Sequence, residues 1–273
     1  HELIVQKIIY LQKILNELAK HQIEIFNYED LDEADQSYLR DYYYDNIIPL
    51  VTPQSIDPAH PFPLISNLSL NLLVHVKYPN RDKTALTRIK VPVGGGIPRF
   101  LQLPERNGFV ALEEVIEHNL DMLLPGMEIL SCEKFGVTRN ANTERNEEHA
   151  DDLLSLIESE LRDRRFGPIV GLEIAEGMDS SHSGMLAAEL QLNEEQDVFE
   201  FEGCMIAARD LFELVSLDIP ELHDEPHHPI DHVGLNDKQS IFYTIRDSGP
   251  FLLQHPYESF GTSVERFLKE AST

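Results

Sequence analysis

Five prolines lie close together between Pro49 and Pro63, and this segment places the strongest limit on how the chain can fold. Each proline fixes φ and keeps the residue before it out of the helical region, so a helix cannot run through the segment. We therefore expect an extended stretch and a domain boundary between residues 48 and 49. The sequence patterns before and after this boundary predict different kinds of structure.

Before the prolines, apolar residues recur at spacings of three and four, which is typical of an amphipathic helix. The first such stripe consists of Leu3 or Ile4, Ile8, Leu11, Leu15 and Leu18. A second helical pattern begins near Leu31, where Asp30 or Asp32 can act as the N-cap. We expect residues 1–48 to form an antiparallel helical hairpin. Because the chain begins with His1 and not Met, we interpret this hairpin as the end of a helical domain.

After the prolines, alternating apolar residues predict strands. The clearest alternation consists of Leu68, Leu70, Leu72, Val74 and Val76. Further strands are expected near residues 88–93, 99–103, 128–138, 169–174 and 198–202. Helices are expected near residues 112–124, 147–164, 185–190 and 210–217. Because helices and strands mix irregularly, we expect residues 49–235 to form an α+β domain and not a regular doubly wound sheet.

The end of the chain has a pattern of its own. Residues 216–235 contain three prolines and little apolar periodicity, which indicates a surface loop or linker. Beyond it, apolar residues predict a helix near Ile241, a strand from Phe251 to Leu253 and a final helix near Phe267. One strand and two helices cannot enclose a core. We therefore expect residues 236–273 to be the first elements of a truncated domain.

The composition excludes several classes of protein. With 22 Lys and Arg against 48 Asp and Glu, the formal charge is −26, so generic nucleic-acid binding is not expected. Cys132 and Cys204 lie far apart without a CxxC partner, which argues against a disulfide framework, a zinc site or a redox pair and favours a cytoplasmic protein. No window approaches about twenty uncharged apolar residues, so we expect no transmembrane segment.

Common catalytic motifs are absent from the sequence, which has no phosphate-binding P-loop, no GxSxG nucleophile elbow and no HExxH zinc helix. Gly94–Gly96 lie between two expected strands, so we predict a hairpin turn there. Ser181, His182 and Ser183 are adjacent, whereas a catalytic triad is assembled from distant positions. We predict a helix-capping turn before Met185 at this point.

One segment has the residue types of a metal site. Residues 221–232 read ELHDEPHHPIDH, with histidines from His223 to His232. Imidazoles and carboxylates can bind zinc or nickel, but Pro226 and Pro229 prevent one helix from aligning them. We favour an exposed linker without a bound metal. A stand-alone protein- or metal-binding module without catalysis stays open as the alternative function, with metal-dependent hydrolysis through this loop as a weaker one.

Several longer strings are the most specific signal in the sequence. They are DPAHPFPLISNLSLN at 57–71, IPRFLQLP at 97–104, LLPGMEIL at 123–130, FGVTRNA at 135–141 and RRFGPIVGLEI at 164–174. In this order they resemble the head (middle) domain of the histidine-phosphorylating polyphosphate kinase family. The later string IRDSGPFLLQHPYESF, at 245–260, is similar to the start of that family's first C-terminal catalytic domain. The resemblance covers nearly the whole chain.

The resemblance implies a reaction for the longer protein. Members of this family transfer the terminal phosphate of ATP reversibly to inorganic polyphosphate through a phosphohistidine, with Mg²⁺. They form homo-oligomers, are cytoplasmic and can associate with the membrane. The family's catalytic histidine and metal-contacting arginines have no counterpart in this chain. We therefore expect no catalytic residue, no bound ATP or metal and no activity in the chain alone, which would serve assembly and the path of the substrate.

Five residues are the candidates for substrate binding. Arg139 and Asn140 follow a strand pattern, where an arginine can bind phosphate through two bonds or form an internal ion pair. Arg164 and Arg165 belong to the densest basic run, which can border a polyphosphate path or neutralise nearby carboxylates. His255 precedes a proline, and a packed or capped side chain is the alternative to a role in binding.

Overall fold

The computed structural model describes residues 2–57, 61–79, 83–104, 108–140, 167–201, 206–235 and 239–272. The chain forms two compact units, His1–Leu217 and Asp218–Thr273. The change from one unit to the next lies at the start of the proline-containing segment that was expected to be a linker. The domain limits inferred from the sequence, after residues 48 and 235, stay predictions.

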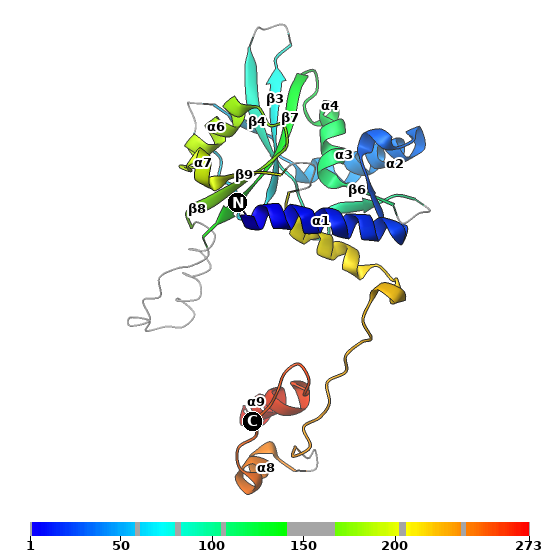
Figure 1. Cartoon of the computed structure of the whole chain (residues 1–273), viewed down its shortest axis with the longest axis vertical. Coiled ribbons are helices and arrows are strands. Elements are labelled where there is room, and N and C mark those ends of the chain that lie inside the picture. Colours follow the sequence, from blue (N-terminus) through cyan, green and yellow to red (C-terminus); the bar gives the residue numbers. More distant parts are fainter. Residues whose placement is uncertain are drawn as a thin grey trace. The chain divides into compact units, whose positions relative to one another are not determined.

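Two helices open the first unit, and a short strand separates them (Figure 1). Helix α1 spans Glu2–Lys20, β1 spans Glu24–Phe26, and α2 spans Glu33–Tyr42. Asp32 is the N-cap of α2 and accepts hydrogen bonds from the backbone N–H groups of the next turn. Between β1 and α2, the chain forms the 3₁₀ helix η1, Tyr28–Asp30.

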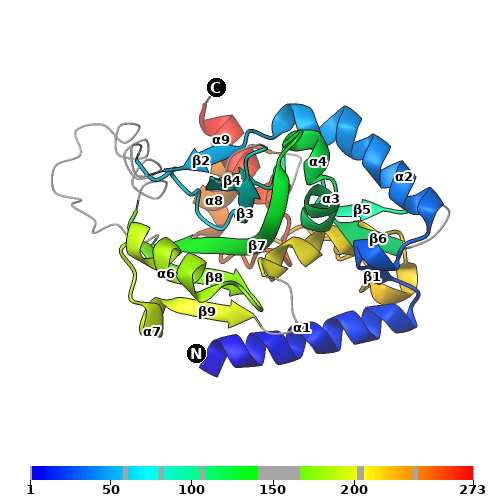
Figure 2. The same cartoon turned by 90° about the horizontal axis from the view of Figure 1, so that it is seen from above.

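The two helices do not follow the expected hairpin. Strand β1 enters a sheet between them, and Figure 2 shows α1 and α2 along different sides of the first unit. Ile4 and Ile8 of α1 pack on the same apolar cluster that contains Leu39 of α2. Each helix therefore buries its apolar stripe in a common core, and not against the other helix.

A three-stranded sheet lies next to these helices. Its order is β1-β6-β5, where β5 is Phe100–Gln102 and β6 is Gly108–Ala111. β6 is parallel to β1 and antiparallel to β5. Helices α3, Leu112–His118, and α4, Leu120–Leu123, follow β6 directly.

A six-stranded sheet has the order β2-β4-β3-β7-β8-β9. These strands are β2 (Gln54–Ile56), β3 (Leu70–Lys77), β4 (Thr84–Lys90), β7 (Glu128–Arg139), β8 (Ile169–Ala175) and β9 (Val198–Phe201). All neighbours are antiparallel except β8 and β9, which are parallel. The segment between these two strands contains α6, Ser180–Glu189, and α7, Glu194–Asp197. The mixed arrangement confirms the α+β fold class.

Alternation along β3 explains why the core has two parts. Leu72 and Val74 belong to the cluster that packs with the N-terminal helices, and Leu73 belongs to a second cluster with Leu186 of α6. Successive side chains of a strand point to opposite faces, so β3 supplies both clusters. This strand is buried along nearly its whole length because helices cover both faces.

Other predictions need correction. Gly94–Gly96 have positive φ, and the N–H and C=O of Gly94 bond with those of Ile97, so the tight turn is present. The flanking strands β4 and β5 belong to different sheets, so the turn leads from one sheet to the other and closes no hairpin. Residues 210–217 lie mainly in a 3₁₀ helix, η5, Ala208–Ser216. The helix expected at 147–164 lies outside the described residues.

The second unit is small and mostly irregular. It contains η6 (Pro220–Leu222), α8 (Ile241–Ser248), η7 (Gly261–Glu265) and α9 (Arg266–Ala271). The strand expected at Phe251–Leu253 is wrong: these residues are irregular, and Leu252 is 88% exposed. A strand needs a neighbouring strand, and the described part of this unit offers an isolated bridge between Ile230 and Glu258 only. No helix among the described residues combines the length and apolarity needed to cross a membrane.

Candidate functional site

Arg139 lies at the end of β7 and is almost fully buried. Its Nε and Nη2 donate to the carbonyl of Ile65 at 3.0 and 2.9 Å, and its Nη1 donates to the carbonyl of Gly167 at 2.6 Å. Burial lowers the pKa of the guanidinium, which is expected where main-chain carbonyls and not carboxylates accept these bonds. The guanidinium therefore ties two loops to the strand end.

Of the other candidates, the structure describes Asn140 and His255. Asn140 is exposed, and its backbone N–H donates to the carbonyl of Pro168 at 2.9 Å. Arg164 and Arg165 lie outside the described residues. His255 belongs to the second unit, where its ring lies edge-on to Phe260 and its Nδ1 lies 2.8 Å from the carbonyl of Glu258. Whether any of them binds substrate stays a prediction.

The histidine-rich loop is largely irregular. His227 Nε2 lies 3.2 Å from the carbonyl of Pro256, and His232 Nδ1 accepts the backbone N–H of Gly234 at 3.0 Å. In the described part of the chain, no group of three or more His, Cys, Asp or Glu side chains could hold a metal ion. Whether this chain binds a metal stays a prediction.

The segment Ser181–Ser183 lies in the first turn of α6. Asp179 is the N-cap and accepts the backbone N–H of Ser181 at 2.8 Å, so the predicted helix-capping turn is confirmed. His182 points to the large sheet, where its Nδ1 lies 2.7 Å from Glu133 Oε2 on β7. This contact holds α6 to the sheet and forms no nucleophilic site with the neighbouring serines.

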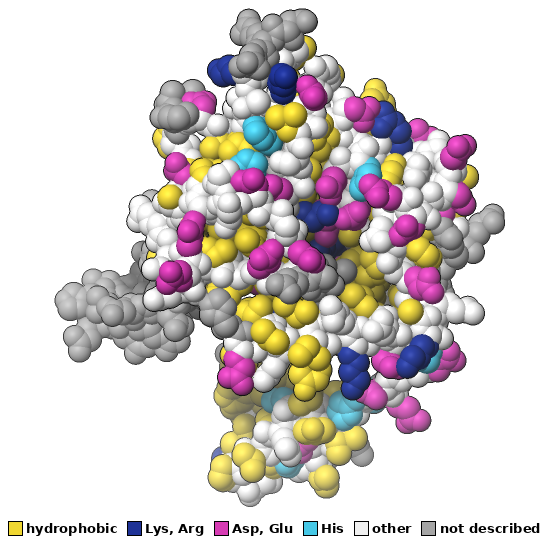
Figure 3. Space-filling view, turned by 45° about the horizontal axis from the view of Figure 1, so that its top comes forward, with side chains coloured by type: hydrophobic (Ala, Val, Ile, Leu, Met, Phe, Trp, Pro, Cys, Tyr) yellow, Lys and Arg dark blue, Asp and Glu magenta, His cyan; other side chains and the backbone are white. Residues whose placement is uncertain are grey.

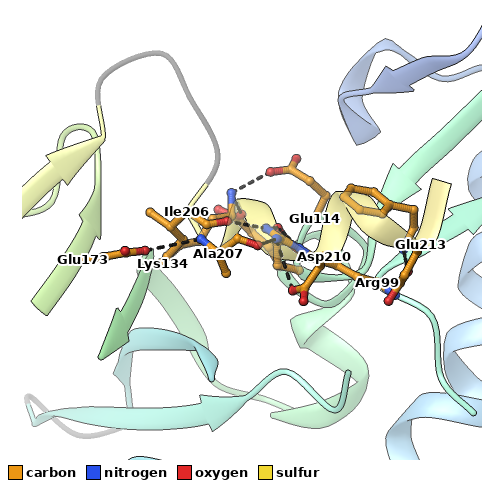
Figure 4. Close-up of polar contacts among 11 residues, drawn as sticks. Arg99, Glu114, Lys134, Glu173, Ile206, Ala207, Asp210 and Glu213 are labelled. Atoms are coloured by element: carbon orange, nitrogen blue, oxygen red, sulfur yellow. Dashed lines mark hydrogen bonds and ion pairs between the residues drawn. The ribbon is translucent and has the colours of Figure 1, made fainter. Parts of the chain in front are cut away.

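Arg99 is the centre of a polar network in the first unit, and its side chain is fully buried (Figure 4). Its Nε and Nη2 donate to the carboxylate of Glu113, which is buried in α3. Its Nη1 donates to Ala207 O at 2.7 Å and approaches Asp210 Oδ2 at 3.4 Å, while Nη2 donates to Ile206 O at 2.9 Å. We call these residues, together with Glu213, the Arg99 cluster.

Glu213 joins the Arg99 cluster through backbone N–H groups and not through the guanidinium. Its Oε2 accepts the backbone N–H groups of Arg99 at 2.7 Å and Phe100 at 3.2 Å. Burial alone would lower the pKa of Arg99, but the charges of Glu113, Asp210 and Glu213 outweigh burial and the pKa is raised. The guanidinium is therefore permanently charged and holds η5 to the strands and to α3.

Lys134 forms a second ion network close by, also drawn in Figure 4. From β7 its Nζ reaches Glu114 at 2.6 Å and Glu117 at 2.7 Å, both of which lie in α3. Burial opposes the charged form, but the two carboxylates dominate and raise the pKa of the ammonium. Lys134 thus holds α3 to the large sheet, and its charge is balanced by two carboxylates and does not favour a phosphate.

A groove of about 630 Å³ lies beside the Arg99 cluster. Its walls include Tyr38, Tyr42, Ile97, Phe100, Phe109 and Leu214. Glu213 is a charged residue of this lining, and the described residues contribute no Lys or Arg to it. Figure 3 shows the same imbalance on one face of the molecule, where Asp and Glu side chains outnumber Lys and Arg. An apolar ligand suits such a groove better than a polyanion.

The sequence analysis missed the Arg99 cluster. Arg99 falls within the mostly apolar string from Ile97 to Leu103, and Glu113 falls within the expected helix at 112–124. A charged residue inside a buried pattern signals a buried ion pair. That signal was available, but nothing in the sequence indicates that Asp210 and Glu213 join the same network.

The comparisons with known proteins identify the family. The profile of the family described as "Polyphosphate kinase middle domain" matches residues 34–214. The chain is 38% identical over 273 residues to "Polyphosphate kinase" of Mycolicibacterium gilvum and 37% identical over 281 residues to that of Mycobacterium tuberculosis. In both cases the match covers 97% of this chain and 37% of the relative.

A solved structure has the same fold. The "Crystal Structure of Polyphosphate Kinase from Porphyromonas Gingivalis" matches with a TM-score of 0.70 at 21% identity, and the match covers 98% of this chain and 39% of that chain. The chain thus spans about 37% of the length of the curated relatives it matches. On the profile match and the identity to the curated relatives, the chain belongs to the polyphosphate kinase family.

Proposed function

We propose that the longer protein to which this chain corresponds is a polyphosphate kinase that transfers the terminal phosphate of ATP reversibly to polyphosphate through a phosphohistidine, with Mg²⁺. In this proposal the chain supplies the head domain, residues 49–235, with the end of a helical domain before it and the start of a catalytic domain after it. The protein works as a homo-oligomer in the cytoplasm or at the membrane, without nucleic acid.

One observation supports a scaffolding role for the chain itself. Three buried or partly buried cations of the first unit are engaged by the protein: Arg99 with Glu113, Lys134 with Glu114, and Arg139 with main-chain carbonyls. Arg88 is also buried and donates to Asn71 and Gln54, but its Nη2 has no hydrogen-bond partner. Phosphoryl transfer needs cationic groups directed at the transferring phosphate. Side chains already committed to internal bonds do not meet this need. The chain would then shape the assembly and the substrate path while other domains carry out the chemistry.

The proposal is tested by incubating the purified chain with ATP, Mg²⁺ and a polyphosphate primer and measuring polyphosphate formation. The chain alone is expected to be inactive, and the full-length protein, assayed in parallel, is expected to be active. Turnover by the chain that persists after removal of contaminating kinases would contradict the placement of catalysis elsewhere. An inactive full-length protein would contradict the proposed reaction itself.

A further inference from the structure

Arg88 is a buried cation without a counter-charge in the part of the chain that the structure describes. It lies in β4, between β2 and β3, and only 5% of its surface is exposed. Its Nε donates to Oδ1 of Asn71 at 2.9 Å and its Nη1 donates to Oε1 of Gln54, but its Nη2 has no hydrogen-bond partner. Both partners are neutral amides, so hydrogen bonds hold the guanidinium while no carboxylate balances its charge.

The other buried arginines of the first unit are satisfied. Acidic side chains raise the pKa of Arg99, whereas burial alone lowers the pKa of Arg88 to about 10. Arg139 has no carboxylate either, but main-chain carbonyls accept from all three of its nitrogens. With 48 Asp and Glu against 22 Lys and Arg, the chain has no shortage of carboxylates that could pair with Arg88. A buried charge left unpaired is costly, and its presence indicates that an anion arrives from outside the chain.

A second cation without an ion pair lies on the same face of β4. Lys90 follows Arg88 by two residues, so the two side chains leave the strand on one side, with their origins about 7 Å apart. Lys90 is exposed, and its Nζ donates to Oγ of Ser66 at 3.4 Å. Neutral groups join the two cations, because Asn71 Nδ2 donates to Ser69 O at 2.9 Å and Ser69 Oγ donates to Ser66 O at 2.8 Å. Within the described residues, neither cation forms an ion pair with an Asp or Glu.

Gln54 covers the guanidinium of Arg88. It lies in β2, a strand of three residues at one edge of the six-stranded sheet, and is paired with Arg88 across the strands (Figure 2). Gln54 is exposed, so rotation of its side chain into water leaves the backbone pairing intact. This rotation frees Nη1 and opens a way to the adjacent Nη2. An oxygen of an anion can then take the place of the amide oxygen of Gln54.

The free donors favour one class of anion. Asn71 already occupies Nε of Arg88, so an anion is bound through Nη1 and Nη2, and the ammonium of Lys90 is a separate third donor. A carboxylate has two oxygens, and both are used by the two terminal nitrogens of an arginine. A phosphate group has further oxygens for the ammonium, and its charge of about −1.5 to −2 near pH 7 matches two cations.

We propose that Arg88 and Lys90 form a binding site for one phosphate group, which displaces the side chain of Gln54. The phosphate is bound by Nη1 and Nη2 of Arg88, Lys90 supplies the second positive charge, and Asn71 keeps the guanidinium in its orientation. This inference does not rest on the proposed transfer reaction. The site can be absent from a protein that makes polyphosphate and present in one that does not.

Equilibrium dialysis of the 273-residue chain against radioactive inorganic phosphate, at constant ionic strength, measures the affinity and the number of sites. One phosphate per chain is expected, and acetate should compete at least about tenfold more weakly than unlabelled phosphate. Tripolyphosphate distinguishes two sources of the phosphate group. Competition as strong as that of phosphate, or stronger, would assign the site to the end of a phosphate chain, and weaker competition would assign it to free phosphate.

Two substitutions of Gln54 should change phosphate binding in opposite directions. Gln54→Glu provides a carboxylate of nearly the same shape, so it should raise the melting temperature of the phosphate-free chain and weaken phosphate binding at least about tenfold. Gln54→Ala removes the competing amide, so it should lower that melting temperature and tighten phosphate binding about threefold. A glutamine with only a structural role would not give this pair of results. Gln102→Glu is the matched control on an exposed glutamine of β5 and should leave phosphate binding unchanged.

A substitution of Lys90 tests the second positive charge. Lys90→Gln should weaken phosphate binding about tenfold, because one charge-assisted hydrogen bond is lost. Lys83→Gln is its control, since Lys83 is an exposed lysine just before the other end of β4. Both side chains are already in water, so circular dichroism should show both variants folded.

Three results with the chain would overturn the proposal. They are no saturable binding of phosphate up to about 10 mM, unchanged binding in Gln54→Glu, and equal losses of binding in Lys83→Gln and Lys90→Gln. The full-length protein, dialysed in the same way, is expected to bind with an affinity within about threefold of that of the chain. Binding by the chain but not by the full-length protein would show that another part of the longer protein supplies the counter-charge, and would also overturn the proposal.

Discussion

Arg99 and Glu113 form an ion pair in which both side chains are withdrawn from water, with 0% and 5% of their surface exposed. Arg99 precedes β5 and Glu113 lies in α3, so the pair joins the three-stranded sheet to the helix that follows it. The same guanidinium also bonds to Ile206 O and Ala207 O. Its loss would leave a buried carboxylate and two carbonyls without their donor.

We therefore expect Arg99→Met to destabilise the first unit by about 3–5 kcal/mol, because a buried carboxylate loses its counter-charge. Urea unfolding followed by circular dichroism measures the change. Adding Glu113→Gln to Arg99→Met should recover part of the loss, since it removes the stranded charge. Arg209→Ala is the control on a 60% exposed arginine and should change the stability by less than about 0.5 kcal/mol.

Substitutions of Arg139 can distinguish a structural role of this residue from a role in substrate binding. Arg139→Met leaves the carbonyls of Ile65 and Gly167 without these donors, which should cost about 1–3 kcal/mol in the free energy of unfolding. Any affinity of the chain for polyphosphate, measured by filter binding, should be the same in folded Arg139→Lys as in the unaltered chain. A selective loss of that affinity would show that Arg139 binds polyphosphate.

The pair of Arg40 and Asp121 predicts a dependence of stability on pH. Hydrogen bonds from Arg40, at 3.0 and 2.6 Å, lower the pKa of Asp121. A lowered pKa in the folded state contributes stability above the pKa of the unfolded chain, and this contribution is lost as the pH falls through the folded value. Between about pH 5 and pH 3, the chain should therefore lose more stability than Asp121→Asn. Parallel slopes for the two proteins would contradict this role of the pair.

Cys132 should be slow to react with thiol reagents. Burial in β7 raises the pKa of its thiol, and the thiolate is the reactive form. In a Cys204→Ser background at about pH 8, labelling by a disulfide reagent should be slow in the folded chain and fast in urea. Equally fast labelling in both states would show that the strand exposes the thiol.

Local patterns were enough to predict the longer elements. The alternation from Leu70 to Val76 predicted β3, whose successive side chains belong to two core clusters. The spacing of Ile4 and Ile8 predicted α1, whose apolar stripe faces the core. The strands β1, β2 and β6 were missed. Strands of three or four residues carry almost no periodicity, and they form here because a partner strand lies beside them.

The candidate site was less predictable than the fold. Arg139 was recognised as a notable residue, but its partners, the carbonyls of Ile65 and Gly167, come from loops whose paths are not encoded in any short pattern. The Arg99 cluster has the same origin, because Glu113 and Glu213 reach Arg99 from separate elements. The sequence shows that an arginine lies in a mostly apolar string. Only the packed structure shows which groups that arginine contacts.

The parallel pairing of β1 with β6 has a consequence for the order of events during synthesis. Glu24–Phe26 leave the ribosome long before Gly108–Ala111, and β1 has no other strand to pair with among the described residues. A contact between segments so distant along the chain forms late. Until it forms, the earlier strand has no partner strand. Helix α1 directly precedes β1, so we expect its final packing to form only after the small sheet closes.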